Sequence, residues 1–508
     1  MKLVAMLSLA LLAGAAQQSV AAVSCASLKN ADIADAKITL AEDVTPNPEW
    51  KLPPSVFTGP AAAHLPWPHS TKAPFCRVAL TLGKENRVEV WLPRNWNGAL
   101  QGVGNGGLTG GINYPAMVEP LEKGFATAST DTGHETDGFF DSSWITGHPE
   151  RVLDFGHRAH HQMAVAAKAV VAKYYEKPAR KAYYSGCSSG GWQGLTEAQK
   201  YPADYDGIVA GAPAINFVRL QSRSLLEEQL DVREPGNYVT AELGALLAKA
   251  AVAKCDAYDG VKDGVIDDPR KCDFDPSELQ CKGNAQQDCL KPGEVARAKW
   301  LYGPQQTQKG LKLYPGPAYG APPTAAVPGL DPRHPADMAI VLMMQETPPT
   351  LSYKNFDPDK HIPMLEQRFG ADLAAMNPDL SAFKARGGKL IMYHGWADPL
   401  LSPYNSIDYY ESVKAKMGAA QQQDFMTMFM VPGMLHCMGG AGPDHFDAVD
   451  AVMKWVEHGE RPKQIVAAHA TAGKVDRTRP LCPYPQVARY KGAGSTDDAA
   501  SFSCAEIH

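Results

Sequence analysis

The chain alternates between short apolar runs and stretches with apolar residues at helical spacing. Apolar runs of strand length occur at 124–133, 181–186, 206–214, 388–398 and 424–430. Apolar residues three and four positions apart predict helices at 153–175, 192–200 and 445–459. Because strands that alternate with helices tend to form parallel sheets, this pattern predicts an α/β fold with a mostly parallel sheet.

Two departures from this alternation indicate how the chain is organised. Residues 77–92 hold two alternating segments around a turn, which predicts a β-hairpin. After about residue 213 the pattern gives way to helical stretches, closely spaced cysteines and Pro/Gly-rich loops, and it restarts at 388. A chain of 508 residues also exceeds one ordinary core. We therefore predict a catalytic domain formed by 23–213 and 388–508, with an inserted lid domain at 214–387.

The N-terminus has the pattern of a secretory signal. Met1 and Lys2 give a positive end, residues 3–16 are apolar, and the segment 20–22 fits a small-residue cleavage site. We predict a signal peptide at 1–22 and a secreted or periplasmic protein. The alternative of a lipoprotein would need a lipobox before Cys25, which the residues "AVSC" match poorly. No other run reaches transmembrane length.

Composition and charge narrow the class of partner. The chain is 44% hydrophobic and 20% charged, as is usual for a soluble globular protein, and its net charge of −6 gives no reason to expect nucleic acid or an anionic membrane. An even number of cysteines in an oxidising compartment predicts disulfides. The ten cysteines are Cys25, Cys76, Cys187, Cys255, Cys272, Cys281, Cys289, Cys437, Cys482 and Cys504.

A candidate nucleophile follows the predicted strand at 181–186. The residues "GCSSG" at 186–190 fit the motif G-x-S-x-G, in which a sharp strand-to-helix turn exposes a serine hydroxyl. Here the motif follows a strand and precedes a helix, so it predicts Ser188 as the nucleophile. An ordinary Gly/Ser turn is the alternative, and Ser189 would need a shifted frame.

A nucleophilic serine needs a base, and the base needs an acid that orients it. On this type of sheet they follow in the order serine, aspartate, histidine. Asp398 comes directly after one predicted strand, and His436 follows the strand at 424–430. We therefore predict Asp398 as the acid and His436 as the base, with Asp408 and His394 as alternatives.

Two cysteines flank these predicted catalytic residues. Cys187 precedes Ser188, and Cys437 follows His436. If hydroxyl and imidazole lie within reach of each other, the two sulfurs are close enough to join, and a bridge would hold the nucleophile loop to the base loop. The alternative is a thiolate at Cys187 activated by His436. We favour the bridge, because Cys187 is not at the centre of the motif.

The residues "GCSSGGWQGLTEAQKYPADYDGIVAGAPA", with "HC" downstream, resemble the tannase and feruloyl esterase family, which also contains hydrolases of the hydroxyethyl terephthalate half-ester. The motifs "GVGNGGLTGGIN", "STDTGH" and "YKNFDPDKH" extend the similarity over nearly all of the chain after residue 22. The resemblance implies an α/β-hydrolase fold and the triad Ser188, Asp398 and His436. It also implies five disulfides, which are Cys25–Cys76, Cys187–Cys437, Cys255–Cys272, Cys281–Cys289 and Cys482–Cys504.

A glycine-dense loop at 102–107 precedes the serine motif. It satisfies G-x-G-x-x-G, but the residues after it do not have a helical pattern, so a dinucleotide site is poorly supported. The better interpretation is an oxyanion loop, because a tetrahedral intermediate needs two aimed N–H donors. We predict one donor at the amide of Ser189 and the other at Gly106 or Gly107.

The segment 255–268, called the acidic loop below, repeats Asp-Gly. Taken alone, this pattern favours two solvated Asp-Gly turns over a metal site. The family resemblance instead implies a calcium site, in which Asp256, Asp259 and Asp263 bind through side chains and Val261 and Val265 through carbonyl oxygens. Because this loop is far from the triad in sequence, we expect a structural role for the ion.

Together these features predict a secreted serine esterase whose substrate is a small ester. The resemblance implies an aromatic acid, from a plant polymer or a polyphenol. A feruloyl ester is favoured, a gallate ester (tannase) comes next, and the terephthalate half-ester is third. Candidate substrate contacts are Arg219, Arg223 and the segment 343–357. A secreted binding protein on a hydrolase fold is the alternative that is not an enzyme.

Overall fold

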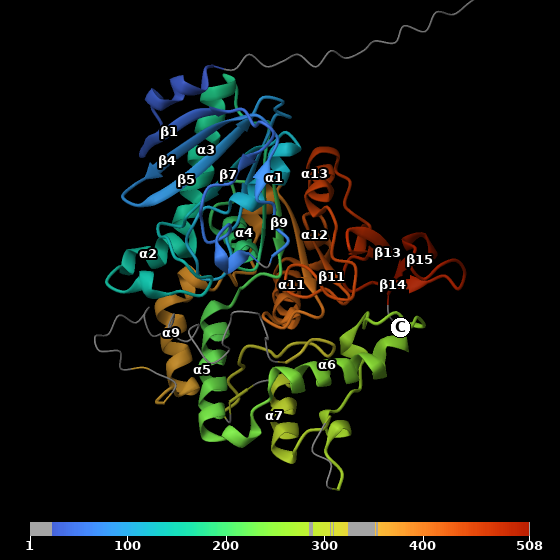
Figure 1. Ribbon diagram of the computed structural model, residues 1–508. Coiled ribbons are helices and arrows are strands. Elements are labelled where there is room, and N and C mark those ends of the chain that lie inside the picture. The colour runs from blue at the N-terminus through green and yellow to red at the C-terminus, as the bar shows by residue number, and fades with distance from the viewer. Residues whose placement is uncertain are drawn as a thin grey trace, which may run out of the picture.

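The computed structural model shows a sheet domain with a second group of helices beyond one end of the sheet (Figure 1). The described residues are 23–63, 65–283, 288–304, 306–307, 309–323, 351 and 354–506. The predicted signal peptide at 1–22 lies outside them, and so does most of the segment 343–357 with its candidate substrate contacts.

A nine-stranded sheet forms the centre, in the order β1-β4-β5-β7-β6-β8-β9-β10-β11. The strands are β1 (Ala36–Val44), β4 (Phe75–Leu82), β5 (Asn86–Pro93), β6 (Ala99–Val103), β7 (Ala126–Thr130), β8 (Lys181–Cys187), β9 (Gly207–Gly211), β10 (Lys389–Gly395) and β11 (Met426–Val431). Strands from β7 to β11 are parallel, which confirms the predicted α/β class, whereas β1, β4 and β5 pair antiparallel. β4 and β5 are the predicted hairpin. β1 was not predicted, because it is an edge strand with mostly exposed or half-buried residues.

Helices cover both faces of this sheet. They are α1 (Tyr114–Glu122), α3 (Ala159–Tyr175), α4 (Ser189–Lys200), α11 (Pro403–Met417) and α13 (Ala448–His458). Tyr184 of β8 packs in a core with residues of α3, α4 and α11, whereas its neighbour Tyr183 packs in a separate core with α13. Because neighbouring residues of a strand point to opposite faces, α13 lies across the sheet from the other three. The three predicted helices are confirmed, and the first includes a π-helical turn at Asp154–Arg158.

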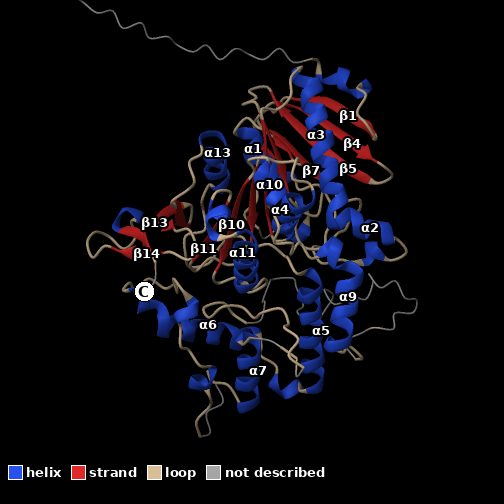
Figure 2. Cartoon of the chain, turned by 180° about the vertical axis from the view of Figure 1, so that it is seen from behind, coloured by secondary structure: helices blue, strands red, loops and turns tan. Residues whose placement is uncertain are grey.

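The long connection from β9 to β10 contains the segment 214–387, for which the sequence predicts an inserted domain. The two strands are parallel neighbours, with Gly207 opposite Lys389, yet residues 212–388 separate them. The helices of this connection are α5 (Phe217–Arg233), α6 (Ala241–Cys255), α7 (Pro292–Tyr302), α9 (Pro358–Leu373) and α10 (Ser381–Ala385). Figure 2 shows α5, α6, α7 and α9 together beyond the sheet, and a small core that includes Leu247 and Leu301 lies within this group. Its role as a lid stays a prediction.

The remaining elements are short. After α13 the chain forms two antiparallel hairpins that the sequence pattern did not predict. They are β12 (Ile465–Thr471) with β13 (Lys474–Leu481), and β14 (Val487–Tyr490) with β15 (Phe502–Ala505). The other short elements are β2 (Trp50–Lys51), β3 (Ser70–Thr71), α2 (Pro149–Leu153) and α12 (Ala419–Gln423).

All ten cysteines are in disulfides, in the five pairs that the resemblance implies. They are Cys25–Cys76, Cys187–Cys437, Cys255–Cys272, Cys281–Cys289 and Cys482–Cys504. The predicted disulfides are therefore confirmed. Within the described part of the chain, none of the helices combines the length and apolar character that crossing a bilayer requires.

Glu197 on α4 is a buried carboxyl group from which we expect a pH-dependent stability. Burial raises the pKa of Glu197 well above its usual value, and the charge of Asp204 raises it further. The contribution of the Glu197 carboxyl group to stability is therefore fully present below its pKa in the unfolded chain. It is lost as the pH rises toward its pKa in the folded protein. Glutamine at this position cannot ionise. We therefore expect the free energy of unfolding of Glu197→Gln to rise relative to that of the wild type by about 1 kcal/mol or more as the pH goes from 4 to 8. Urea unfolding of both proteins at both pH values measures this difference. The same difference in free energy of unfolding at pH 4 and at pH 8 would contradict the prediction.

Candidate active site

The predicted nucleophile occupies the turn between β8 and α4. Ser188 has φ 63° and ψ −123°, a strained conformation for a residue with a side chain. Glycine is required on both sides of it. A Cβ at Gly186 would lie 2.6 Å from the carbonyl carbon of Gly190, and a Cβ at Gly190 would lie 2.9 Å from the carbonyl oxygen of Asn105. The structure thus has the strained strand–turn–helix context that the motif requires.

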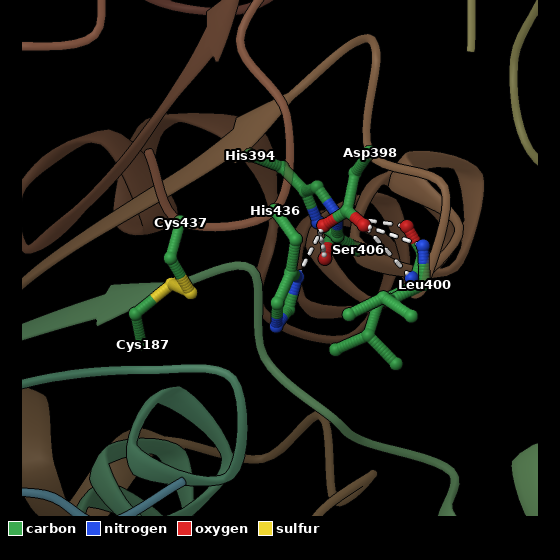
Figure 3. Close-up of a disulfide and its surroundings, with 8 residues drawn as sticks. Cys187, His394, Asp398, Leu400, Ser406, His436 and Cys437 are labelled. Carbon is green, nitrogen blue, oxygen red and sulfur yellow. Dashed lines mark hydrogen bonds and ion pairs between the residues drawn. A yellow bond between two sulfur atoms is a disulfide. The ribbon is translucent and has the colours of Figure 1, made fainter. Parts of the chain in front are cut away.

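Asp398 and His436 meet beyond the carboxyl ends of β10 and β11. His436 Nδ1 donates to Asp398 Oδ2 at 2.7 Å, which leaves Nε2 available as a base (Figure 3). Asp398 Oδ1 accepts the backbone N–H groups of Leu400 and Leu401, at 2.8 and 3.0 Å. Burial raises the pKa of Asp398, but the charge of His436 and hydrogen bonds from His394 and His436 outweigh it and hold the pKa below its usual range. Asp398 is therefore ionised.

Neither of the two alternatives to this pair faces Ser188 as a base or an acid would. His394 is fully buried, and its ring contacts Asp398 and Ser406. Asp408 on α11 forms an ion pair with Lys312 at 2.5 Å and is about half exposed. Neither is placed to act as base or acid for Ser188, whereas His436 keeps an exposed edge.

The disulfide between Cys187 and Cys437 joins the nucleophile loop to the base loop, as predicted. Their Cα atoms are 6.0 Å apart although 250 residues separate them along the chain. Figure 3 shows the bridge next to His436. Within the described residues no hydrogen bond joins Ser188 to His436, and in enzymes of this kind that bond often tightens only when substrate is bound. The thiolate alternative fails, because the sulfur of Cys187 is oxidised.

Near the nucleophile, the backbone N–H groups of Gly106, Gly107 and Ser189 have no acceptor among the described residues. Ser189 begins α4, where helical N–H groups lack an intrahelical partner. Its hydroxyl donates to the carbonyl oxygen of Gly107, so the glycine loop lies against the start of α4. Gly107 has φ 60°, and a Cβ there would lie 2.1 Å from the carbonyl oxygen of Phe139. These N–H groups are the kind of donor that an oxyanion needs.

Asn105 holds the glycine loop in place, a role that the sequence analysis missed. Its Nδ2 donates to the carbonyl oxygens of Gly111 and Thr130, both at 2.9 Å, and its backbone N–H donates to Gln193 Oε1 at 3.0 Å. Its Oδ1 lies 3.0 Å from His160 Nε2. A single asparagine within a glycine run was the only available signal. Because α1 does not follow the glycines directly, the dinucleotide alternative lacks its structural context.

An aromatic cluster of Phe57, Trp67 and Phe139 lies beside the glycine loop and was also missed. The ring centroids are 5.6 to 6.1 Å apart. Phe57 is buried, and a Cβ at Gly106 would lie 3.6 Å from its ring, whereas Trp67 and Phe139 are half-buried. The three rings come from segments without long strands or helices, so no periodic pattern pointed to them.

Arg219 and Arg223 of α5, the candidate substrate contacts, are engaged within the inserted segment. They form ion pairs with Glu366 and Glu227, at 2.6 and 2.5 Å. Each also donates to a backbone carbonyl oxygen of the segment before residue 316. These bonds give both guanidinium groups a structural role.

The acidic loop contains buried carboxylates. Both oxygens of Asp256 accept backbone N–H groups, from Asp263 and Gly264 at 3.0 Å. Asp263 pairs with Arg479, and burial followed by the charge of Asp263 raises the pKa of Asp259. Within the described residues, no three His, Cys, Asp or Glu side chains are arranged to hold a metal ion. The oxygen donors and the repulsion between carboxylates fit calcium, but the arrangement in which they would bind it is not preformed.

The acidic loop is far from Asp398 and His436 in sequence, but this part of the chain packs against the loops that carry them. Val265 touches the base loop, since a Cβ at Gly433, three residues before His436, would lie 2.3 Å from Val265 Cγ1. Arg270, just after the acidic loop, stacks on Trp396 in the loop after β10, with 5.8 Å between the guanidinium carbon and the ring centroid. The acidic loop therefore supports the loops that carry Asp398 and His436.

Comparison with known proteins identifies the family. The family described as tannase and feruloyl esterase matches residues 76–328 and 337–505. The chain belongs to this family. The mono(2-hydroxyethyl) terephthalate hydrolase of Piscinibacter sakaiensis is 34% identical over 83% of this chain and 81% of its own. A probable feruloyl esterase B-1 of Aspergillus flavus is 33% identical over 84% of this chain and 86% of its own.

A solved structure extends the similarity to the whole fold. The crystal structure of feruloyl esterase B from Aspergillus oryzae superimposes with a TM-score of 0.85 at 28% identity, over 95% of this chain and 99% of that one. The α/β-hydrolase fold and the carboxylic ester hydrolase activity expected from the sequence are confirmed. Relatives that are named as esterases argue against the alternative of a binding protein without catalysis.

Proposed function

We propose that this esterase hydrolyses esters of aromatic acids with a triad of Ser188, His436 and Asp398. One observation carries the proposal. The Cys187–Cys437 disulfide brings the strained serine turn beside a histidine that is already hydrogen-bonded to a buried carboxylate. N–H groups at the start of α4 and in the glycine loop, which have no acceptor in the part of the chain that the structure describes, would bind the oxyanion that acyl transfer forms.

The reaction would proceed through an acyl-enzyme. His436 Nε2 takes the proton of Ser188 as Oγ attacks the ester carbonyl carbon, and the carbonyl oxygen becomes an oxyanion. The amide of Ser189 and that of Gly106 or Gly107 donate to this oxyanion, while Asp398 stabilises the imidazolium. The C–O bond to the alcohol then breaks, and the leaving oxygen takes the proton from His436. Water, activated by His436, attacks the acyl carbon and releases the acid and Ser188.

The aromatic acyl group is supported by two kinds of observation. Relatives named as a feruloyl esterase and as a terephthalate half-ester hydrolase are both about one-third identical to this chain. In addition, the aromatic cluster lies beside the proposed oxyanion loop, where rings are suited to packing against an aromatic acid. A feruloyl ester is the favoured substrate, ahead of a gallate ester and the terephthalate half-ester.

A substrate panel tests this proposal. We expect kcat/KM to be highest on methyl ferulate among methyl ferulate, methyl gallate, the terephthalate half-ester and an acetyl ester of similar size. A gallate or terephthalate optimum would keep the aromatic class and change the rank. Preference for the acetyl ester, with the three aromatic esters all poor substrates, would remove the substrate proposal.

We further propose that the acidic loop binds calcium through side-chain oxygens of Asp256, Asp259 and Asp263 and the carbonyl oxygens of Val261 and Val265. When bound, the ion would neutralise the repelling carboxylates and stiffen the loop. It takes no part in the chemical steps. The support is the family resemblance and the burial of these carboxylates.

Calcium removal is expected to destabilise the protein. Chelation should lower the free energy of unfolding by about 2–3 kcal/mol relative to calcium at a hundred times its Kd. Because Val265 packs on the base loop, kcat should fall as well. Asp259→Asn should abolish the calcium-dependent difference, whereas Asp273→Asn, at an exposed carboxylate just outside the loop, should keep it. An unchanged melting temperature with no metal found by elemental analysis would contradict the site.

Secretion is the third proposal. Five disulfides and an apolar N-terminus ending in small residues support export to an oxidising compartment. N-terminal sequencing of protein from the medium or periplasm should begin at or near Val23. A full-length protein that stays in the cytoplasm would contradict export.

A further inference from the structure

Asp398 Oδ2 is bound by two imidazole rings. His436 Nδ1 lies 2.7 Å from this oxygen, and His394 Nε2 lies 3.1 Å from it (Figure 3). His394 comes from β10, is fully buried, and is not a base for Ser188. A second histidine on the orienting carboxylate has no role in the mechanism given above.

The surroundings of His394 fix which ring nitrogen carries the proton. Nε2 lies 3.1 Å from both Asp398 Oδ2 and the carbonyl oxygen of Leu401, and both atoms can only accept. Nε2 must therefore carry the hydrogen. Nδ1 lies 2.8 Å from Ser406 Oγ, whose hydroxyl has no other hydrogen-bond partner among the described residues. Ser406 can thus donate to Nδ1 and hold the ring in the tautomer that donates to Asp398.

We propose that His394 is a positioning residue for the esterase reaction. Its Nε2–H, oriented by Ser406 on α11, anchors the carboxylate of Asp398 so that Oδ2 faces His436. The inference rests on the proposed triad. It gives His394 two effects. The first fixes the carboxylate geometrically. The second draws negative charge on Oδ2 toward His394, which limits how strongly Asp398 favours the protonated form of His436.

The charge effect predicts a pH signature that loss of packing alone would not give. The titratable groups that face Asp398 in the described part of the chain are His394, His436 and Tyr314. The hydrogen bond from His394 is one of the causes that lower the pKa of Asp398. Without this donor, the charge on Oδ2 acts on His436 alone. The acid-side midpoint of the kcat/KM profile should then move to higher pH.

The test compares a variant that lacks the donor with one that keeps it. His394→Met removes the N–H, and we expect kcat to fall about a hundredfold with KM nearly unchanged, because a small misplacement of a catalytic group costs that much. The acid-side midpoint should rise by about half a pH unit or more. His394→Gln can place an amide N–H near the position of Nε2 and should recover most of both losses. Ser406→Ala removes only the hydroxyl that holds the His394 ring. Its kcat and acid-side midpoint should lie between those of His394→Met and His394→Gln.

Two controls keep the result specific. His161 on α3 forms another His–Asp pair, with Asp204 at 2.6 Å, and His161→Met should leave kcat and the pH midpoint unchanged. Fluorophosphonate titration counts active sites, so kcat refers to folded enzyme only. If His394→Met and Ser406→Ala both keep the wild-type kcat per titrated site and the wild-type midpoint, the inference is overturned. If Ser188→Ala remains active, the triad itself fails, which is a distinguishable outcome.

Discussion

Replacing Ser188 with alanine should lower kcat on aromatic esters by about 10⁴-fold or more, with the melting temperature nearly unchanged. The hydroxyl is the only group proposed to bond covalently to the substrate, so the remaining donors can bind the ester but not cleave it. Stability should hold, because Ser188 Oγ makes no hydrogen bond to another described residue. The backbone strain at φ 63° applies to alanine as it does to serine, so the substitution adds no strain. Steady-state kinetics and thermal unfolding measure both.

The neighbouring serine is a matched control. Ser189→Ala keeps the backbone amide of the proposed oxyanion hole and loses only the hydroxyl bond to Gly107. We expect a loss of less than tenfold and normal fluorophosphonate labelling, whereas Ser188→Ala should not label. If the two variants behaved in the opposite way, the nucleophile would be Ser189 and the motif would be read in the wrong frame.

Removing the disulfide at the active site should damage both stability and catalysis. Cys187→Ala with Cys437→Ala opens a bridge between residues 250 apart, and the chain-entropy model gives about 5 kcal/mol for a loop of that length. The same change frees the loops that carry Ser188 and His436. We therefore expect kcat to fall at least a hundredfold even below the melting temperature, because the serine and the base are no longer held together.

A second disulfide separates these two effects. Cys281–Cys289 spans 8 residues in the inserted segment, for which the same model gives about 2.5 kcal/mol. Cys281→Ala with Cys289→Ala should lower the melting temperature modestly and leave kcat close to the wild type. If both pairs lowered kcat equally at a temperature where both variants are folded, the bridge at the active site would have no catalytic role beyond stability.

The central strands and the helices between them could be predicted because each has a periodic apolar pattern of its own. β9 and β11 are buried throughout, β8 and β10 each contain a buried apolar stretch, and α13 has its apolar residues on one face. The edge strand β1 and the two hairpins after α13 expose much of their surface, so their patterns were too weak to recognise. Burial, rather than the regularity of the backbone, decided which elements the sequence showed.

In the candidate site, the order of serine, aspartate and histidine and the cysteines beside two of them were enough to predict which residues meet. The same reasoning left His394 and Asp408 as alternatives, since a histidine or aspartate in a loop has the same sequence pattern whatever it faces. The structure separates them, because His394 is buried against Asp398 and Asp408 pairs with Lys312 at the surface. Asn105 and the aromatic cluster went unnoticed for the same reason.

The sequence by itself determined the strand and helix order of the core, the strained turn at Ser188 and the pairing of the cysteines through the family resemblance. Only the tertiary structure decided that His394 and His436 share one carboxylate oxygen, that the acidic loop packs on Gly433, and that Arg270 beside it packs on Trp396. The physical reason is the range of the interactions. Periodicity and turns depend on residues a few positions apart, whereas these contacts join segments more than a hundred residues apart, or depend on which way a single buried ring points.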